Sequence, residues 1–415
     1  MKIVQANKFH FVKGGAERYY LDLSRRLEQR GHEVIPFAMA DPRNEPSSHA
    51  EYFVGAVDYR TRMGTARKMR QAARAIYSRE TVHKASLLAR RERPAIAHLH
   101  NIYHQISPSL ILAFHRCGVP MVQTLHDYKV VCPGYLFMSR GQICEACFQR
   151  NHGQMIARRC LLDSYPASIA GWMEWRLHSW LQTYARIARF LAPSRFLLEK
   201  VAEHGIPREK LVHFPYFLPL EDYRPAYARS SYFVYLGRLS REKGIATLLA
   251  ALGMRQGSLV CRILGEGPLE PALRRQAEEA GLRQVEFRGY LQGEELQTAI
   301  RDAAFTVVPS EWYENLPFSV IESFALGTPV VGARIGGIPE MVIEGETGRT
   351  FAPGDAAALA AALDWMESHP EEMLAMGSKA RQFAEREYSP GPHLDRLEKL
   401  YAEVAREARD AKEKR

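Results

Sequence analysis

The chain has 415 residues, of which 46% are hydrophobic and 25% are charged. These values exclude a largely disordered or collagenous chain, and the length is too great for one hydrophobic core, so we expect two domains. The formal net charge of +9 indicates an anionic partner, which can be nucleic acid, a nucleotide or an anionic membrane surface. The N-terminus has no cleavable apolar leader, and no later segment reaches about 18 uninterrupted apolar residues, so we expect a cytoplasmic protein.

Short β-rich runs alternate with longer helical patterns along the whole chain. The first are the strand KIVQA, a helix from Ala16 to Gly31 and the strand HEVIPFA. Such alternation predicts βαβ units and parallel sheets, in which ligands bind beyond the carboxyl ends of the strands. Gly14 and Gly15 lie in the first such loop, where glycine lets the backbone approach an anion at a helix N-terminus. An ordinary tight turn is the alternative interpretation.

A strongly basic stretch covers residues 59–93, in which Arg and Lys far outnumber Glu and apolar residues are interspersed. A basic amphipathic helix of this kind can lie on an anionic membrane. A later helix places Trp172, Trp175 and Trp180 among cations, which is again consistent with a membrane interface, although three Trp in one helix are more often core residues. We prefer peripheral membrane contact to a merely solvated face.

Two histidine-containing segments follow strand-like runs, IAHLHNIYH and VPMVQTLHDYK. His126 and Asp127 end the second run at the expected edge of a cleft, where an imidazole could contact a substrate. A lone histidine is usually structural, and we keep that interpretation for His98, His100 and His104.

Most of the cysteines are concentrated in an insertion at about residues 130–162. Cys132, Cys144, Cys147 and Cys160 include a C-x-x-C pair, with one further cysteine roughly a dozen residues to each side. This spacing fits a tetrahedral structural zinc site, and a cytoplasmic location disfavours disulfides. Free structural thiols are the main alternative, and an iron–sulfur cluster is a more distant one.

The second half of the chain begins after HFPYFLPLEDYRPAY, which has the composition of a linker. In YLGRLSREKG a predicted strand ends at Gly237, and Arg238 and Lys243 bracket the loop before the next helix, as suits a diphosphate. In ILGEGPLEPAL, Gly265 and Gly267 allow tight turns after the following strand. Taken singly, each loop can also be an ordinary connection between a strand and a helix.

The most informative segment is FTVVPSEWYENLPFSVIESFALGTPVVGA. A strand ends at Ser310, Glu314 lies in the loop, Pro317 begins a helix, and Glu322 lies five residues farther on, roughly 7 to 8 Å along the helix axis. That offset resembles the length of a nucleotide, so a diphosphate at the helix N-terminus leaves Glu322 to accept hydrogen bonds from both ribose hydroxyls. The backbone that would meet the diphosphate is Asn315, Leu316, Pro317 and Phe318.

Glu314 and Glu322, with seven residues between them, together with GRLSREKG and IGGIPEMVIEGETG, resemble the donor half of family 4 retaining glycosyltransferases. GGAERYYLDLSRRLEQRGHEV is similar to the family's first βα unit, so the resemblance covers nearly the whole chain. It implies the GT-B architecture, which is an α/β fold of two Rossmann-like, doubly wound parallel-sheet domains facing a cleft. We place the N-terminal domain at 1–220, the C-terminal donor domain at 228–389, and a helical tail that crosses back at 390–415.

The resemblance also implies roles for residues. Arg238 and Lys243 would bind the diphosphate, Glu314 the transferred sugar and Glu322 the ribose. The Gly14–Gly15 loop would face the diphosphate and the acceptor across the cleft, with His126 near the transferred sugar or the reacting centre.

These features predict transfer of a sugar, with retention, from a nucleoside diphosphate sugar to a hydroxyl of a glycan or lipid-linked acceptor in cell-surface polysaccharide assembly. UDP is favoured on family grounds. We expect no catalytic metal, because two cations can substitute for magnesium and no DxD-like pair ends a strand, and no nucleic acid, because the basic residues lack a reading motif. A nucleotide-sugar epimerase and a non-catalytic nucleotide-sugar-binding scaffold are the alternatives.

Overall fold

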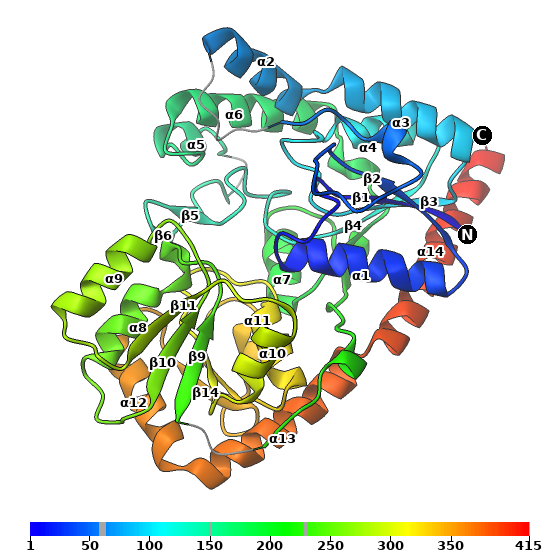
Figure 1. Cartoon of the computed structure of the whole chain (residues 1–415). Helices are drawn as coiled ribbons and strands as arrows, with labels where there is room; N and C mark the ends of the chain where they lie inside the picture. The colour runs from blue at the N-terminus through cyan, green and yellow to red at the C-terminus, as the bar shows by residue number, and fades with distance from the viewer. Residues whose placement is uncertain (58–63, 149–150, 228–230, 415) are drawn as a thin grey trace.

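The computed structural model describes residues 1–57, 64–148, 151–227 and 231–414, and it has two α/β domains (Figure 1). Each domain is built on a six-stranded sheet in which every pair of neighbouring strands is parallel. The predicted class, two doubly wound parallel-sheet domains, is confirmed.

The N-terminal sheet has the strand order β2-β1-β3-β4-β7-β8. Its strands are β1 (Lys2–Ala6), β2 (Glu33–Phe37), β3 (Ile96–Leu99), β4 (Met121–Thr124), β7 (Arg189–Ala192) and β8 (Leu211–His213). A two-stranded antiparallel hairpin, β5 (Met138–Ser139) and β6 (Gln142–Ile143), lies outside this sheet.

Helices cover both faces of the N-terminal sheet. The helices described in this domain are α1 (Gly15–Gln29), α2 (Thr65–Ile76), α3 (Arg79–Glu92), α4 (Ser109–Arg116), α5 (Gln154–Ala157), α6 (Tyr165–Trp180) and α7 (Arg195–Glu203), and α2 and α5 pack against α6. Strand side chains alternate between the faces: Ile3 belongs to the same apolar cluster as Leu23 of α1, whereas Val4 belongs to the cluster of Leu88 and Phe114 from α3 and α4. This period of two is what a strand buried on both faces produces.

The C-terminal sheet has the order β11-β10-β9-β12-β13-β14, which is the classic order of a dinucleotide-binding sheet. Its strands are β9 (Tyr232–Leu236), β10 (Val260–Leu264), β11 (Val285–Gly289), β12 (Thr306–Val308), β13 (Val330–Ala333) and β14 (Gly348–Phe351). The helices are α8 (Ile245–Leu252), α9 (Glu270–Glu279), α10 (Gly293–Arg301), α11 (Phe318–Ala325), α12 (Ala356–Ser368) and α13 (Pro370–Glu387). The strand order reverses between β9 and β12, and ligands of such sheets bind beside that point.

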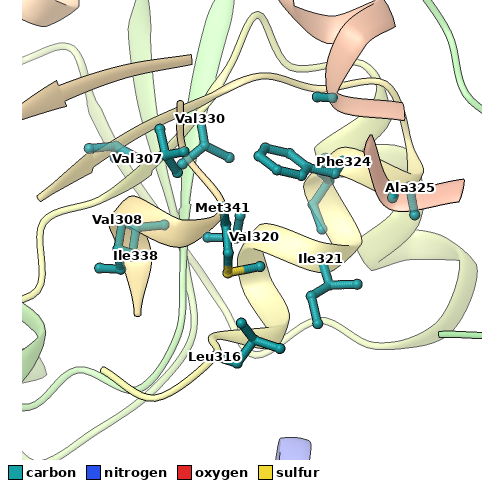
Figure 2. Close-up of a cluster of buried hydrophobic side chains, with 14 of the residues drawn as sticks. Val307, Val308, Leu316, Val320, Ile321, Phe324, Ala325, Val330, Ile338 and Met341 are labelled. Carbon is teal, nitrogen blue, oxygen red and sulfur yellow. The ribbon is translucent and has the colours of Figure 1, made fainter. Parts of the chain in front are cut away.

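Helix α11 is anchored by an apolar cluster. Val320, Ile321 and Phe324 are fully buried and pack among Val307, Val330 and Met341 from the neighbouring strands and the segment after them (Figure 2). Burial of each such side chain contributes about 1.5 to 3 kcal/mol, so the position of α11 is strongly fixed. The helix was predicted from Pro317 to its end at Gly327, and it runs from Phe318 to Ala325 with Pro317 as N-cap.

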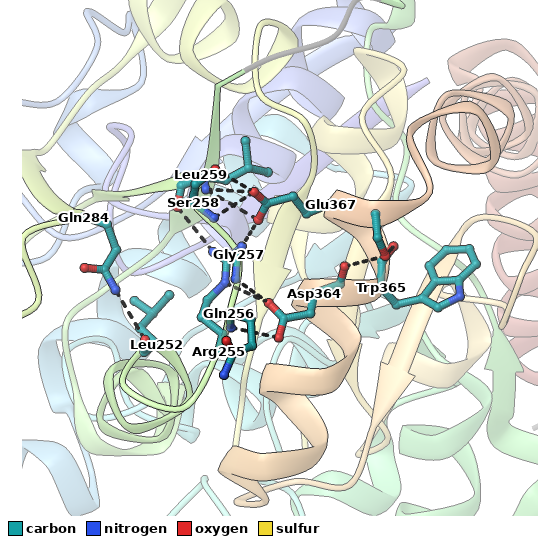
Figure 3. Close-up of polar contacts among 11 residues, drawn as sticks. Leu252, Arg255, Gln256, Gly257, Ser258, Leu259, Gln284, Asp364, Trp365 and Glu367 are labelled. Carbon is teal, nitrogen blue, oxygen red and sulfur yellow. Dashed lines mark hydrogen bonds and ion pairs between the residues drawn. The ribbon is translucent and has the colours of Figure 1, made fainter.

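A buried arginine links the loop before β10 to helix α12 in the C-terminal domain. The Arg255 side chain is fully buried and pairs with Asp364 at 3.3 Å and with Glu367, both on α12 (Figure 3). The same carboxylates accept backbone N–H groups of the loop before β10, including those of Gly257 at 3.1 Å and Ser258 at 2.7 Å. Because all the partners are satisfied, this network fixes the loop to α12.

The connection between the sheets is not a solvated linker. Phe214, Tyr216, Phe217 and Leu220 are all buried, and they join the apolar cluster that runs from α1 into the C-terminal domain. The final helix, α14 (Pro390–Glu413), returns along the N-terminal domain (Figure 1). There the Tyr401 hydroxyl lies 2.6 Å from Nδ1 of His98.

Candidate functional site

The loops after β9 and β12 meet at the reversal point of the C-terminal sheet. The loop after β9 forms a 3-10 turn (Arg241–Lys243) that ends in the left-handed Gly244, and α8 follows. The Glu311 N–H of the second loop donates to the Glu242 carbonyl at 2.9 Å. An added methyl group at Gly244 would overlap the Pro309 carbonyl, so glycine permits this close approach.

Lys243 and Glu314 form an ion pair in this place. The Lys243 ammonium donates to Oε1 of Glu314 at 2.6 Å, and the Ser310 hydroxyl donates to the same oxygen at 2.7 Å. The Glu314 side chain is buried, whereas a quarter of the Lys243 side chain remains exposed. The pair therefore offers an ammonium to the solvent side while its counter-ion is held inside the domain.

Arg238 presents a second cation at the same edge. It is exposed, and its guanidinium makes no hydrogen bond or ion pair with other described residues. The preceding residue, Gly237, has a φ of 149°, a conformation that side chains rarely adopt. The free guanidinium and the Lys243 ammonium lie on either side of the loop, and their binding of a diphosphate stays a prediction.

Gly265 and Gly267 have a structural reason for being glycine. A methyl group at Gly265 would lie 2.0 Å from the Gly237 carbonyl oxygen, and one at Gly267 would lie 2.3 Å from that of Leu239. Both therefore let the loop after β10 pack against the loop after β9. They shape the loop after β9, and their role as direct donor contacts stays a prediction.

The N-terminus of α11 faces the N-terminal domain. Asn315 is buried and its amide donates to the Leu125 carbonyl at 2.8 Å, while its oxygen accepts the Ser194 hydroxyl at 3.0 Å. Leu316 is buried in the core, and Pro317 leaves the first N–H groups of the helix without intrahelical partners. A diphosphate is the kind of ligand that such a helix end attracts.

The Gly14–Gly15 loop lies directly opposite. A methyl group at Gly15 would come within 2.5 Å of the Phe318 ring, so the two domains touch here. The Phe318 ring also stacks on Tyr216, with 5.0 Å between centroids. This contact places the first helix of one domain, α1, against α11 of the other.

Glu322 is paired with a residue of the other domain. It is buried, and it accepts a hydrogen bond from the Arg18 guanidinium of α1, which also donates to the Tyr223 hydroxyl. Burial raises the pKa of Glu322, and the Arg18 charge opposes that shift. A ribose that hydrogen-bonds Glu322 would have to share the carboxylate with Arg18 or displace it.

His126 lies in a chain of buried rings. Its Nε2 is 3.0 Å from Nδ1 of His100, and its Nδ1 is 2.8 Å from the Tyr216 hydroxyl. Burial lowers the pKa of His126 to about 3, so the ring is neutral at ordinary pH. Both nitrogens are engaged, which makes His126 an oriented neutral group and not an acid.

Two carboxylic acids near these rings were not assigned a role from the sequence. Burial raises the pKa of Glu17, in the first turn of α1, and that of Asp127, and the Lys8 ammonium opposes both shifts. Asp127 also accepts the Lys129 N–H at 2.9 Å. A carboxylic acid with a raised pKa is suited to proton transfer or to binding a hydroxyl.

Arg18, Tyr216 and Tyr223 are the cleft residues that sequence reasoning missed. Arg18 lies three residues after Gly15 in the first turn of α1, and that position was the available signal. The two tyrosines lie in the aromatic-rich stretch interpreted as a linker, whose aromatic content should have indicated burial.

The sequence matches two family models. One, described as Glycosyltransferase Family 4, matches residues 13–222, just over half of the 415-residue chain; the other, Glycosyl transferases group 1, matches residues 224–383. The chain belongs to glycosyltransferase family 4. The predicted family is thus confirmed, and the border between the two matches falls in the buried connection after β8.

Several characterised relatives of this family 4 member share part of its sequence. Glycogen synthase of Mycobacterium tuberculosis is 37% identical over 153 residues, which cover 36% of this chain and 37% of the relative. D-rhamnosyltransferase WbpZ of Pseudomonas aeruginosa is 30% identical over 241 residues, which cover 55% of this chain and 60% of the relative. Amylovoran biosynthesis glycosyltransferase AmsK of Erwinia amylovora is 26% identical over 251 residues, which cover 57% of this chain and 59% of the relative. The matches span between about one third and three fifths of these relatives.

Solved structures of the same fold extend over almost the whole family 4 chain. Anabaena Alr3699/HepE in complex with UDP has a TM-score of 0.70 at 16% identity, covering 97% of this chain and 100% of that one. Sucrose-phosphate synthase from Thermosynechococcus elongatus has a TM-score of 0.71 at 20% identity, with 97% and 98% covered. At these identities the likeness establishes the fold.

Proposed function

We propose that this chain is a retaining glycosyltransferase that moves a sugar from a UDP-sugar to a hydroxyl of a glycan or lipid-linked acceptor in cell-surface polysaccharide assembly, with release of UDP. The observation that carries the proposal is the Lys243–Glu314 pair, at 2.6 Å, beside the N-terminus of α11 and opposite the Gly14–Gly15 loop. A pyrophosphate at that helix end would meet backbone N–H groups and two cations together.

Lys243 and Arg238 would act mainly on the leaving group. Negative charge grows on the departing diphosphate as the glycosidic bond breaks, so fixed cations there stabilise the transition state more than the ground state. The diphosphate would compete with Glu314 for the Lys243 ammonium, and Glu314 would then be released toward the sugar. We propose that no catalytic metal is required, and undiminished transfer in excess EDTA is the expected result.

UDP and retention are the finer parts of the proposal. A solved structure of the same fold is a complex with UDP, which supports the choice of base. Retention rests on the family resemblance. Proton NMR of the first product formed tests it, because an inverted anomeric configuration would contradict retention.

The acceptor is proposed from the names of relatives and from surface charge. WbpZ and AmsK are named for rhamnosyl transfer and amylovoran biosynthesis, both sugar-transfer functions. No described helix is long and apolar enough to span a membrane. We propose that the protein instead contacts an anionic membrane surface where a lipid-linked acceptor would lie.

The face proposed for that contact is formed by α2 and α6, which pack together, and the segment before α6. Large apolar side chains are exposed along it, among them Trp180 at 75%, Leu162 at 76% and Met69 at 64%. Exposed cations flank them: Lys68, Arg70, Arg158 and Arg176. Apolar insertion and attraction to anionic headgroups act together on such a face. Of the basic stretch, Arg60 and Arg62 lie outside the described residues.

The decisive experiment is a screen of nucleotide sugars for binding, hydrolysis and transfer, repeated with Glu322→Gln. The amide keeps the shape but is a weaker acceptor for two ribose hydroxyls, so we expect weaker binding of the preferred donor. Equal binding of every donor by both proteins would contradict the ribose assignment. An isomerised nucleotide sugar formed without acceptor would indicate an epimerase, and binding with no turnover on any acceptor would indicate a scaffold.

A further inference from the structure

The cysteine segment, described here at residues 132–148 and 151–160, follows the loop after β4. It is called the cysteine module below. Cys132 follows the strand-end loop and its N–H donates to the Tyr128 carbonyl at 2.7 Å. Cys144 directly follows the β5–β6 hairpin, and its N–H donates to the Phe137 carbonyl at 2.7 Å. The hairpin thus returns the chain from the neighbourhood of the first cysteine to the C-x-x-C pair.

The C-x-x-C pair lies at a tight turn. The Phe148 N–H donates to the Glu145 carbonyl at 2.9 Å, which closes a turn that contains Cys147 and begins directly after Cys144. Cys160 follows α5, and its N–H donates to the Met155 carbonyl at 3.1 Å. A turn and a helix end therefore deliver three of the four thiols.

The thiols converge on one place. The methyl position of Gly134 is 3.3 Å from Cβ of Cys160 and 3.9 Å from Sγ of Cys132, so these two cysteines flank the same glycine. The Cys147 thiol lies within electrostatic reach of the thiols of Cys132, Cys160 and Cys144. The loop after β4, the C-x-x-C segment and the end of α5 thus bring the four cysteines to one region.

The surroundings suit a site of negative charge. Two cations lie near the thiols, Arg158 beside Cys147 and Cys160 and Lys129 beside Cys132. The Ser139 hydroxyl is buried beside the Cys160 thiol. A hydroxyl in that position can donate a hydrogen bond to the thiolate that metal binding would create.

We propose that Cys132, Cys144, Cys147 and Cys160 bind one zinc ion as four thiolates. Tetrahedral Zn–S bonds of about 2.3 Å bring sulfurs closer together than they lie here, where no three of the described thiols are within 4.8 Å of one another. Zinc binding therefore requires a change of side-chain rotamer at some of the cysteines, while the path of the backbone stays the same. Each thiol releases its proton when it becomes a ligand.

The site would brace the boundary between the domains. Glu145, inside the C-x-x-C turn, accepts the Tyr313 hydroxyl at 2.8 Å, and Tyr313 is the neighbour of Glu314. Lys200 of α7 pairs with the same carboxylate at 3.0 Å. At the other end of the module, a methyl group at Gly141 would overlap the Arg241 guanidinium. The module thus contacts both loops that carry the Lys243–Glu314 pair.

The first test is metal analysis of the full chain, purified under reducing conditions without chelators. We expect about one zinc per chain by inductively coupled plasma mass spectrometry. No bound metal, together with no uptake from one equivalent of added zinc, would overturn the proposal. Iron with acid-labile sulfide would also overturn it in favour of a cluster.

Variants then locate the ion. Cys144→Ser and Cys147→Ser should each reduce zinc content at least tenfold, whereas Cys117→Ser, a half-buried thiol outside the group, should retain it. Retention of zinc by both C-x-x-C variants would overturn the assignment. If these variants do not fold, wild-type protein titrated with a mercurial reagent should release zinc as the four thiols react, and release that precedes their reaction would overturn it.

Discussion

Lys243 and Glu314 are the two residues whose contact most restricts the chemistry of the site. A buried carboxylate needs a partner, and this one has two, the ammonium and the Ser310 hydroxyl. The two residues differ in exposure: the Lys243 ammonium reaches the exposed edge, whereas the Glu314 carboxylate is buried. Removing the cation should therefore affect both the stability of the loop and the departing diphosphate.

We predict that Lys243→Met lowers the transfer rate by about 10² to 10³, the usual effect of losing one preorganised charge. It should also lower the melting temperature, because Glu314 is left buried with Ser310 alone. Steady-state kinetics and calorimetry measure the two effects. Lys379→Met on the exposed side of α13 is the matched control, and equal rates for the two variants would contradict the role of Lys243.

His126 predicts a pH dependence of stability. Its pKa is about 3 in the folded protein and about 6.5 when unfolded, so between these values the unfolded chain binds a proton that the folded chain does not. The contribution of His126 to the free energy of unfolding is therefore fully present above about pH 6.5. It falls as the pH is lowered, by about 2 kcal/mol between pH 6.5 and 5. Urea unfolding at both pH values measures the change.

The variant His126→Gln isolates this contribution, because other buried groups remain in both proteins. Burial also lowers the pKa values of His98 and His100, and raises that of Asp127, which acts in the opposite direction. We expect the variant to lose less stability than wild type on acidification. An identical loss in both proteins would show that His126 is not neutral in the folded state.

At the scale of elements, α11 was predictable because its limits are local. Pro317 fixes the backbone at its start, Gly327 takes a φ of 77° after its end, and the apolar residues between them demand burial. The offset between Glu314 and Glu322 followed from helix geometry alone. The partners of these residues could not be predicted, since Arg18 and Glu322 are 304 positions apart and meet only after both domains have folded.

The exposed face of α2 and α6 predicts binding to anionic vesicles. Replacement of two α2 cations, Lys68→Glu with Arg70→Glu, should abolish flotation with phosphatidylglycerol vesicles, because each cation near the surface contributes about 1 kcal/mol. The control is the double variant Lys379→Glu with Lys399→Glu, which makes the same change of charge on α13 and α14 and should float like wild type. Equal flotation of both double variants would mean that α2 and α6 do not form the contact surface.

At the scale of the whole molecule, the sequence established two domains, yet it could not give their contact. The class of each sheet follows from alternating strands and helices, which are local patterns. The buried connection was interpreted as a linker because Pro and aromatic residues also mark exposed turns; Tyr216 is buried because α1 and α11 close over it. Contacts of this kind depend on the relative position of two surfaces, which no local pattern encodes.

Glu340 provides the clearest bond between the domains. It lies in the 3-10 turn after β13 (Ile338–Glu340), and its carboxylate accepts the N–H groups of Arg195 at 2.8 Å and Phe196 at 2.7 Å. These are the first residues of α7 in the N-terminal domain. The carboxylate therefore caps a helix of the other domain and faces the positive end of its dipole.

We predict that Glu340→Ala loosens the closed arrangement of the domains. Removal of a cap costs about 0.5 to 2 kcal/mol, and here that cost falls on the interface, where the alternative is an open cleft with solvated N–H groups. Small-angle X-ray scattering should give a larger radius of gyration for the variant, and saturating nucleotide should reverse the increase, because a ligand bound by both domains favours closure. Glu346→Ala, an exposed residue of the same domain, should scatter like wild type. A radius of gyration equal to that of wild type in Glu340→Ala would mean that the other contacts, such as Asn315 to Leu125, hold the domains closed without the cap.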